Sequence, residues 1–204
     1  MKIITVCPVS FGANCYLLIS DGHALVVDPA PSATAIQSKA EEEGAVIDGI
    51  ILTHGHFDHI VSVDTLRKNL GVPLMIHEDD AEMLTDGRKN AFFDFYGMDR
   101  KYSPAEVLLK DGDTVKVGAE EIKVIHTPGH SKGSVCFLCG DTMLTGDTLF
   151  ADSIGRCDLW GGRDTQMRGS LERLRQYDGK LKILPGHGPA ALLGGALDNA
   201  AYFI

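Results

Sequence analysis

The chain has 204 residues, of which 44% are hydrophobic and 23% charged, proportions typical of a globular protein with a substantial core. The formal net charge of -9 argues against DNA or RNA as the main partner, because nucleic-acid binders present a basic face. The sequence offers no apolar run of the roughly 18 residues that a membrane span needs, and its five scattered cysteines without an export signal favour a cytoplasmic location. We expect one domain over residues 1–204.

The first half of the chain alternates between short apolar strands and helices. Its strands are expected at residues 2–9, 15–20, 24–29, 49–53 and 72–77. Its helices are expected at residues 32–44, 60–70 and 78–84. Ser32 can cap the first turn of the first helix, and Gly44 and Gly71 can end the first two.

The second half repeats this rhythm. Its strands are expected at residues 106–110, 114–117, 121–126, 134–138, 142–150 and 182–185. A helix is expected over residues 164–177, with Asp164 as its N-cap. Two strand-rich halves, each with helices, predict an α+β fold in which two sheets pack face to face with helices outside.

The stretch THGHFDH, at residues 53–59, follows an apolar strand directly and is rich in metal-ligating side chains. Side chains two residues apart point the same way on an extended chain but about 200° apart on a helix. The stretch is therefore expected at the end of a strand, where it turns into the next helix. Four ligands in so short a segment are more than one tetrahedral ion takes, so two ions are expected. The four candidate ligands are His54, His56, Asp58 and His59.

Three more candidate ligands occur later in the chain. His130 lies in HTPGHS, Asp147 in LTGDTLF and His187 in LPGHGP, and each follows an apolar strand beside a glycine. A lone histidine is more often structural than a ligand, but seven candidates in the same local setting favour a binuclear metal site. We expect the strand ends of both halves to converge on it.

These four motifs, in this order and spacing, resemble those of the metallo-β-lactamase superfamily, and the nearest branch is that of the glyoxalase II-like hydrolases. The resemblance runs from NCYLL to GHG and implies a four-layer αββα sandwich with the metals at one edge of the sheets. It implies two ligand sets with Asp147 bridging both: His54, His56 and His130 for one metal, and Asp58, His59 and His187 for the other.

Two features depart from that branch. Glyoxalase II proper continues past its last metal histidine into a helical domain that binds glutathione, whereas 17 residues follow His187 here. The chain is therefore expected to match the short, single-domain relatives. The loop at residues 153–162 has Cys157 and Trp160 where these relatives usually have threonine and proline, so its contacts are expected to differ.

The expected chemistry is hydrolysis of a thioester. A hydroxide that bridges two divalent ions is a nucleophile at neutral pH, and the ions stabilise a tetrahedral oxyanion. A thiolate with a pKa of about 8.5, by analogy with cysteine, leaves without a strong general acid. The sequence thus predicts a hydrolase similar to hydroxyacylglutathione hydrolase, with a small-molecule thioester as substrate. Asp58 and Asp147 are its candidate catalytic residues.

Two other functions compete with this prediction. An iron-dependent persulfide dioxygenase is the alternative, because those enzymes look similar in sequence yet use a single iron. Imidazole and carboxylate suit zinc, iron and manganese alike; zinc is the first expectation. A non-catalytic metal-binding module is disfavoured, because no ligand is missing. The sequence is compatible with a monomer or a homodimer.

Several residues are expected outside the metal site. His126 is interpreted as structural or as a residue that supports a metal ligand without binding the metal, and His77 as a surface or capping group. Cys136 and Cys139, in CFLC, are expected on opposite faces of a strand and hence in the core. The aromatic residues at 92–96 are interpreted as a loop tip on the core, a lid over the substrate or a dimer contact.

Overall fold

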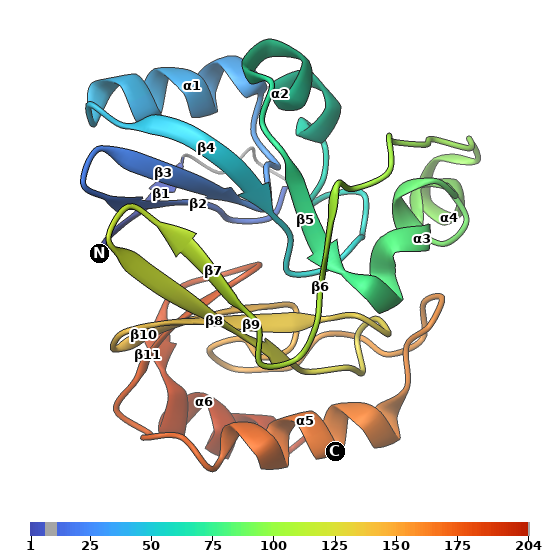
Figure 1. Ribbon diagram of the computed structural model, residues 1–204. Coiled ribbons are helices and arrows are strands. Elements are labelled where there is room, and N and C mark those ends of the chain that lie inside the picture. Colours follow the sequence, from blue (N-terminus) through green and yellow to red (C-terminus); the bar gives the residue numbers. More distant parts are fainter. Residues whose placement is uncertain (7–11, 204) are drawn as a thin grey trace.

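Two sheets of six strands face each other, with helices on the outer side of each (Figure 1). The structure is a computed structural model that describes residues 1–6 and 12–203. The first sheet is built from β1 (Lys2–Val6), β2 (Cys15–Ser20), β3 (His23–Val27), β4 (Val46–Ile51), β5 (Leu74–His77) and β6 (Val107–Leu109), in that order. The second follows the order β12-β11-β10-β9-β8-β7 and is built from β7 (Thr114–Val117), β8 (Glu120–His126), β9 (Val135–Cys139), β10 (Thr142–Gly146), β11 (Lys182–Pro185) and β12 (Ala191–Leu192).

Four helices cover the outer faces of the sheets, and further short ones lie at one side of the sandwich (Figure 1). The helices are α1 (Ala33–Glu42), α2 (Val63–Leu70), the 3-10 turn η1 (Glu78–Asp80), α3 (Ala81–Leu84), α4 (Phe92–Tyr96), α5 (Asp164–Leu174) and α6 (Leu193–Ala200). The pair α1 and α2 lies on the first sheet, and α5 and α6 lie on the second (Figure 1). The predicted α+β, four-layer αββα sandwich is confirmed.

Alternating side chains build three apolar layers. Leu18 and Val27 of the first sheet point inward and share the central layer with Phe137 of the second sheet. Leu17 points outward, and it packs in the layer between the first sheet and α1 and α2. This alternation follows from the two-residue period of a strand, and it explains why strands buried on both faces read as continuous apolar runs.

The directions of the strands decide where the loops meet. β3, β4, β5 and β6 pair in parallel in the first sheet, as do β10 and β11 in the second. β8 runs the same way as β10, because each is antiparallel to β9. The carboxyl ends of β8, β10 and β11 therefore lie at one edge of the second sheet, and those of β3 and β4 at one edge of the first.

The predicted helix ends were mostly right. The hydroxyl of Ser32 accepts a hydrogen bond from the backbone N–H of Ala35 (3.3 Å), and Gly71 ends α2 with a φ of 69°. The N-cap at Asp164 is wrong by one residue, because Arg163 holds that position and the Asp164 carboxylate instead lies in the positive first turn of α5.

Other predicted boundaries need correction. The strand expected at 142–150 stops at Gly146, where a φ of 48° turns the chain out of the sheet. Residues 7–9 of the first predicted strand lie outside the described residues. The residues at 92–96 form a helix, α4, flanked by left-handed conformations at Ala91 and Gly97. The helix α6 and the strand β12 were not predicted.

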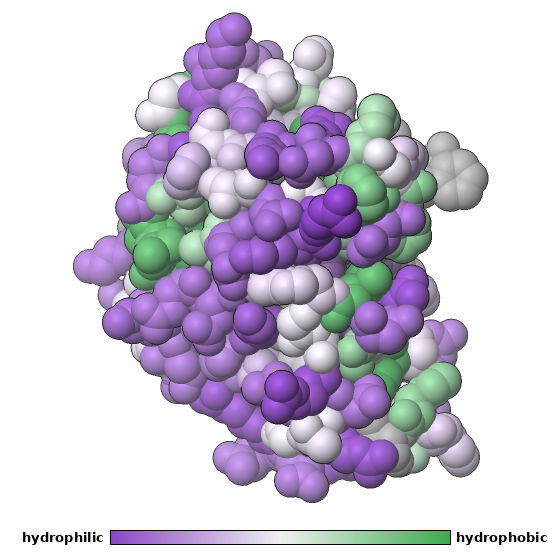
Figure 2. All heavy atoms as spheres, turned by 90° about the vertical axis from the view of Figure 1, so that its right-hand side faces the viewer, coloured by the Kyte–Doolittle hydropathy of each residue, from purple (hydrophilic) through white to green (hydrophobic). Residues whose placement is uncertain are grey.

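The side of the molecule that carries α3 and α4 is mostly hydrophilic, with apolar atoms gathered in separate areas (Figure 2). Phe95, Tyr96 and Met98, on α4 and just after it, are each more than half exposed. Among the described residues, no helix is long and apolar enough to cross a membrane.

Candidate metal centre

The seven predicted ligands meet at one edge of the sandwich. They lie in the loops that leave the carboxyl ends of β4, β8, β10 and β11, where strands of like direction place them together. Their ligand atoms come within 4.8 Å of one another in three overlapping groups: His54, His56 and His130; His54, His59 and Asp147; Asp58, His59 and His187. The groups share members, so the seven side chains form one continuous cluster.

Three buried imidazoles form the first part of this cluster. The Nδ1 atom of His56 lies 2.8 Å from Nε2 of His130, and that atom lies 3.2 Å from Nε2 of His54. His130 comes from the second sheet and the other two from the first, so the contact joins the two halves of the fold.

Contacts outside the cluster fix the tautomers of two of these rings. His130 donates from Nδ1 to the carbonyl of Arg156 (2.7 Å), which leaves the lone pair of a neutral ring on Nε2. The hydroxyl of Thr53 donates to Asp28 (2.6 Å), so its oxygen accepts from Nδ1 of His54 (3.1 Å). Nε2 of His54 then also carries a lone pair, and two lone pairs face each other across 3.2 Å.

Carboxylates join the second part of the cluster. Asp147 lies between three rings, with Oδ1 3.4 Å from Nε2 of His59, and Oδ2 3.5 Å from Nε2 of both His130 and His187. Asp58 approaches from the other side, with Oδ2 3.2 Å from Nε2 of His187. Asp147 therefore touches members of both predicted ligand sets.

Asp28 orients the cluster, although the sequence analysis did not single it out. Its buried carboxylate accepts from Nδ1 of His59 (2.9 Å) and from both the backbone N–H and the hydroxyl of Thr53 (2.8 and 2.6 Å). Its own backbone has a φ of 50°, which a non-glycine residue adopts at a cost. Asp28 comes directly after β3, just as the predicted ligands come after the ends of their strands. This shared position is the feature of the sequence that could have revealed Asp28 as part of the site.

Asp80 holds two ligand loops together and was also missed. Its carboxylate accepts from the backbone N–H of Gly55 (3.2 Å) and of Gly133 (2.6 Å), and from the hydroxyl of Ser131 (2.6 Å). Burial raises its pKa to about 6, even though the three hydrogen bonds act in the opposite direction. In the sequence HEDD, no local feature separates Asp80 from its acidic neighbours.

Burial and neighbouring charges divide the histidines into two classes. Burial lowers the pKa values of His54, His56 and His130, which keeps these rings neutral at pH 7. The pKa of His59 is raised, because Asp147 and its neighbouring carboxylates outweigh the effect of burial. Burial alone would raise the pKa of Asp147, but the surrounding imidazoles lower it, so it is ionised.

The donor set fits divalent cations. Among the described residues, Nε2 of His56, Nε2 of His59 and Oδ1 of Asp147 are buried polar atoms without a hydrogen-bond partner. Such atoms are costly in a folded protein unless something compensates for them. Neutral imidazole nitrogens and ionised carboxylates with unshared lone pairs are the ligands that zinc, iron and manganese take.

A glycine makes the close packing around Asp147 possible. A Cβ atom on Gly186 would lie 2.1 Å from Oδ1 of Asp147 and 2.7 Å from Cε1 of His59. The PGHG motif therefore supplies both a predicted ligand, His187, and the space for two others.

The cluster opens into a cleft of about 360 Å³. Its polar side is the cluster itself, and its apolar side includes Phe57, Phe95, Tyr96 and Leu159. Small-molecule sites combine a largely apolar wall with a few converging polar groups in this way.

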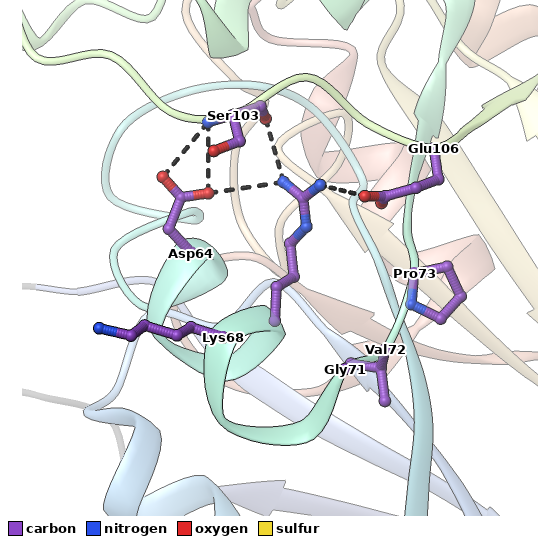
Figure 3. A pocket seen from close by; sticks show the side chains of 8 residues that line it. Asp64, Lys68, Gly71, Val72, Pro73, Ser103 and Glu106 are labelled. Carbon is purple, nitrogen blue, oxygen red and sulfur yellow. Dashed lines mark hydrogen bonds and ion pairs between the residues drawn. The ribbon is translucent and has the colours of Figure 1, made fainter.

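A second pocket, beside α2, is lined by charged groups of which several pair with one another (Figure 3). Asp64 accepts from the backbone N–H of Ser103 (3.2 Å), and Arg67 donates to the carbonyl of the same residue (3.1 Å) and pairs with Glu106. Asp64, Arg67 and Glu106 are thus engaged in these contacts, which join α2 to the segment before β6.

Three histidines lie outside the seven-residue cluster, and His23 among them contacts Asp48 (2.7 Å). The ring of His126 stacks on that of His77, with centroids 4.1 Å apart, and belongs to a separate group with Asp79. The capping role of His77 is confirmed, since Nδ1 accepts from the N–H of Asp79 (3.3 Å), but His77 is buried rather than on the surface.

The cysteines in the described residues have no disulfide partner. Cys136 and Cys139 pack in different apolar layers, as predicted. Burial and the nearby Asp164 raise the pKa of Cys157 to about 12, so its thiol is protonated at neutral pH. The ring of Trp160, the other departure in that loop, has the ammonium groups of Lys89 and Lys132 at 5.0 and 4.2 Å from its centroid.

The match to a known family is decided by the whole arrangement of motifs. The family model of the Metallo-beta-lactamase superfamily matches residues 10–187, a range that includes all seven predicted ligands. The chain belongs to the metallo-beta-lactamase superfamily.

Members of known name or structure cover nearly the same length. The probable metallo-hydrolase YqgX of Bacillus subtilis is 34% identical over 180 residues, which are 87% of this chain and 85% of that protein. The crystal structure of the B3 metallo-beta-lactamase BLEG-1 is 30% identical, with a TM-score of 0.91 over 98% of this chain and 99% of that one. TTHA1623, in a di-iron-bound form, is 31% identical, with a TM-score of 0.83 over 97% and 100% of the two chains. The descriptions of these relatives show that members of the superfamily bind metals and that hydrolases are among them.

Proposed function

We propose that this protein is a metal-dependent thioester hydrolase of the glyoxalase II-like kind, with two divalent ions held by the seven clustered side chains. The observation that carries the proposal is the presence of two complete ligand groups joined by Asp147. His54, His56 and His130 would hold one ion, and Asp58, His59 and His187 the other, with zinc as the first expectation.

When bound, two such ions supply a nucleophile at neutral pH and positive charge for a developing oxyanion. The chain itself positions the ligands. Asp28 and the carbonyl of Arg156 accept hydrogen bonds from Nδ1 of His59 and of His130, so that Nε2 of each ring faces the cluster and offers a lone pair when the ring is neutral.

The cleft suits a substrate whose leaving group needs no strong acid. Among the described residues, Arg156 is the one basic side chain that lines it apart from the predicted ligands, and it is paired with Asp158 through two hydrogen bonds (2.6 and 2.8 Å). Hydrolysis breaks the carbon–sulfur bond, water supplies the hydroxyl of the new acid and a proton, and the sulfur leaves as a thiolate. An amide nitrogen, by contrast, must be protonated as it leaves.

A persulfide dioxygenase requires one iron. The second ligand group, Asp58, His59 and His187, provides the side chains for a second ion, which the proposed hydrolase uses and the dioxygenase does not.

The test uses metal-free protein reconstituted with zinc, iron or manganese. Thiol release from S-lactoylglutathione and from S-acetyl-N-acetylcysteamine is followed with a thiol-trapping dye, and oxygen uptake is followed with glutathione persulfide. Metal-dependent thiol release supports the proposal. Oxygen uptake with iron, and no thiol release with any metal, would reverse it.

A further inference from the structure

An apolar groove adjoins the candidate metal centre. Its volume is about 910 Å³, against about 360 Å³ for the cleft over the metal ligands. The two cavities share Phe57, Asp58 and Tyr96. The groove is therefore a continuation of the cleft, and it starts at a predicted metal ligand.

The wall of the groove is apolar and partly open to solvent. Val61, Tyr96 and Met98 line it and are 38%, 58% and 60% exposed. The ring of Phe57 contacts Phe92 and Tyr96, with centroids 5.7 and 5.6 Å apart, so aromatic packing fixes the inner wall. Large apolar side chains gathered at a cavity and left in water mark a binding surface.

Within the part of the chain that the structure describes, one cation lines this wall, Arg100. The guanidinium of Arg100 lies over the rings of Phe92 and Tyr102, 5.5 and 5.1 Å from their centroids, and donates to the carbonyl of Val61 (3.3 Å). In residues 1–6 and 12–203, no carboxylate forms an ion pair with it, although the chain carries a net charge of -9. Arginine over aromatic rings, with free donors, is suited to a carboxylate.

We propose that the groove binds the acyl part of the substrate, and that the preferred acyl group is an aliphatic chain with a carboxylate at its far end, paired with Arg100. The inference rests on the thioester hydrolysis proposed above. The thioester carbonyl lies at the metal ligands, the chain lies along Phe57, Tyr96 and Met98, and the opposite wall at Leu159 is left for the thiol part.

The first experiment varies only the acyl group. Thioesters of the neutral thiol N-acetylcysteamine are compared: acetyl, octanoyl, and ω-carboxyacyl groups of four, six, eight and ten carbons. We expect kcat/KM for octanoyl to exceed that for acetyl by about tenfold or more, from apolar burial. For one length of the ω-carboxyacyl group, kcat/KM is expected to exceed that of the corresponding methyl ester by about tenfold. A single length is favoured because the position of Arg100 in the groove is fixed.

Variants separate the two parts of the inference. Arg100→Gln should abolish the preference for the ω-carboxylate and retain the octanoyl-to-acetyl ratio, whereas Arg100→Lys should keep part of the preference. Met98→Asp should lower the octanoyl-to-acetyl ratio. Arg168→Gln, at an exposed position on α5, is the matched control and should change neither. Equal kcat/KM across the acyl series, with preferences that follow the thiol part, would overturn the inference and leave thioester hydrolysis intact.

A binding measurement decides the case in which no thioester is cleaved and the proposed function itself fails. Calorimetry then compares acetate, octanoate and the eight-carbon dicarboxylate. Tighter binding of the dicarboxylate, lost in Arg100→Gln and kept in Arg168→Gln, would still support the groove as the binding site for a chain with a terminal carboxylate. Absence of binding by all three would overturn it.

Discussion

Three imidazoles of the candidate metal centre each have one nitrogen that is hydrogen-bonded to a group outside the seven-residue cluster. His130 is tied to the carbonyl of Arg156, His54 to the hydroxyl of Thr53 and His59 to Asp28. The other nitrogens are thereby left with lone pairs that converge. This division of each ring into an anchored side and a free side is the property from which metal binding is inferred.

Asp147→Asn tests the residue that lies between the two ligand groups. The change keeps the size of the side chain and removes the charge that offsets repulsion between two cations. We expect loss of at least one ion and a fall in kcat of about a hundredfold or more, by analogy with lost electrostatic stabilisation at other sites. Metal analysis and thioester kinetics on the same sample provide the check.

The matched control is His126→Asn. His126 stacks on His77 outside the seven-residue cluster, so its replacement should leave the metal stoichiometry unchanged. Loss of a metal in this variant, or two ions and near-normal turnover in Asp147→Asn, would show that the ligands are assigned wrongly.

The raised pKa of Asp80 predicts that the stability of the folded chain depends on pH. Its pKa of about 6 in the folded protein exceeds the ordinary value of 3.8, so the folded chain holds this proton more tightly than the unfolded chain does. The stabilisation of the folded chain that comes from protonated Asp80 is fully present below about pH 4, and it is lost as the pH rises through about 6. The free energy of unfolding of the wild type, relative to Asp80→Asn, should fall by up to about 3 kcal/mol over this range. Urea unfolding of both metal-free proteins measures it; a difference that is flat with pH would contradict the assignment.

The sequence reveals the ligands better than the residues that orient them. Each ligand stands in a repeated setting, after an apolar strand and beside a glycine, and histidine and aspartate there have few structural uses. Asp28 has nearly the same setting, but it looks like an ordinary aspartate before a proline. Asp80 binds donors 25 and more residues away, and only the folded chain brings them together.

At the scale of elements, parallel pairing explains why distant motifs meet. The loops after β10 and β11 leave the same edge of the second sheet, and the backbone N–H of Gly186 donates to the carbonyl of Gly146 (2.8 Å). This contact holds the PGHG loop against the segment that carries Asp147. Strand positions and loop chemistry could be predicted, because apolar runs and glycines mark them locally.

Gly186→Ala and Gly188→Ala form a matched pair within that loop. A Cβ at Gly186 would collide with Asp147 and His59, so we expect a loss of metal affinity of at least about tenfold. Gly188 has a φ of 78° and open space around it, so alanine there should cost about 1 kcal/mol of stability and leave the metal in place. Titration with a metal-sensitive dye and thermal unfolding separate the two effects. Equal metal affinity in the two variants would contradict this account of the loop.

Other elements escape prediction for physical reasons. The helix α6 contains two adjacent glycines, Gly194 and Gly195, which disfavour a helix by propensity, and packing of Leu193 and Leu197 against the second sheet overrides this. The helix α4 is only five residues long, and its limits are set by left-handed backbone at Ala91 and Gly97. Alanine gives no local indication of that conformation.

At the scale of the molecule, the candidate metal centre lies where the two sheets meet. His54, His56, Asp58 and His59 come from the first half, and His130, Asp147 and His187 from the second. Bound ions would therefore connect the two sheets, which also share the apolar layer around Phe137. One domain over residues 1–204 stays a prediction.

Removal of metal should lower the thermal stability of the whole chain. Ions present at about a thousand times their dissociation constant contribute about 4 kcal/mol to the folded state. For a chain of this size, that corresponds to a fall in Tm of about 10 °C on chelation. Calorimetry with and without chelator measures it, and a variant with His54→Ala and His130→Ala should show little response. An unchanged Tm in the wild type would contradict a metal that bridges the sheets.

The most direct test of the binuclear centre is elemental analysis of metal-replete protein, purified without added metal and then saturated with zinc, iron or manganese in turn. We predict close to two ions per chain for the wild type and no more than one for Asp147→Asn. One tightly held iron per chain, with no second ion taken up at saturation, would contradict the two ligand groups and favour the dioxygenase.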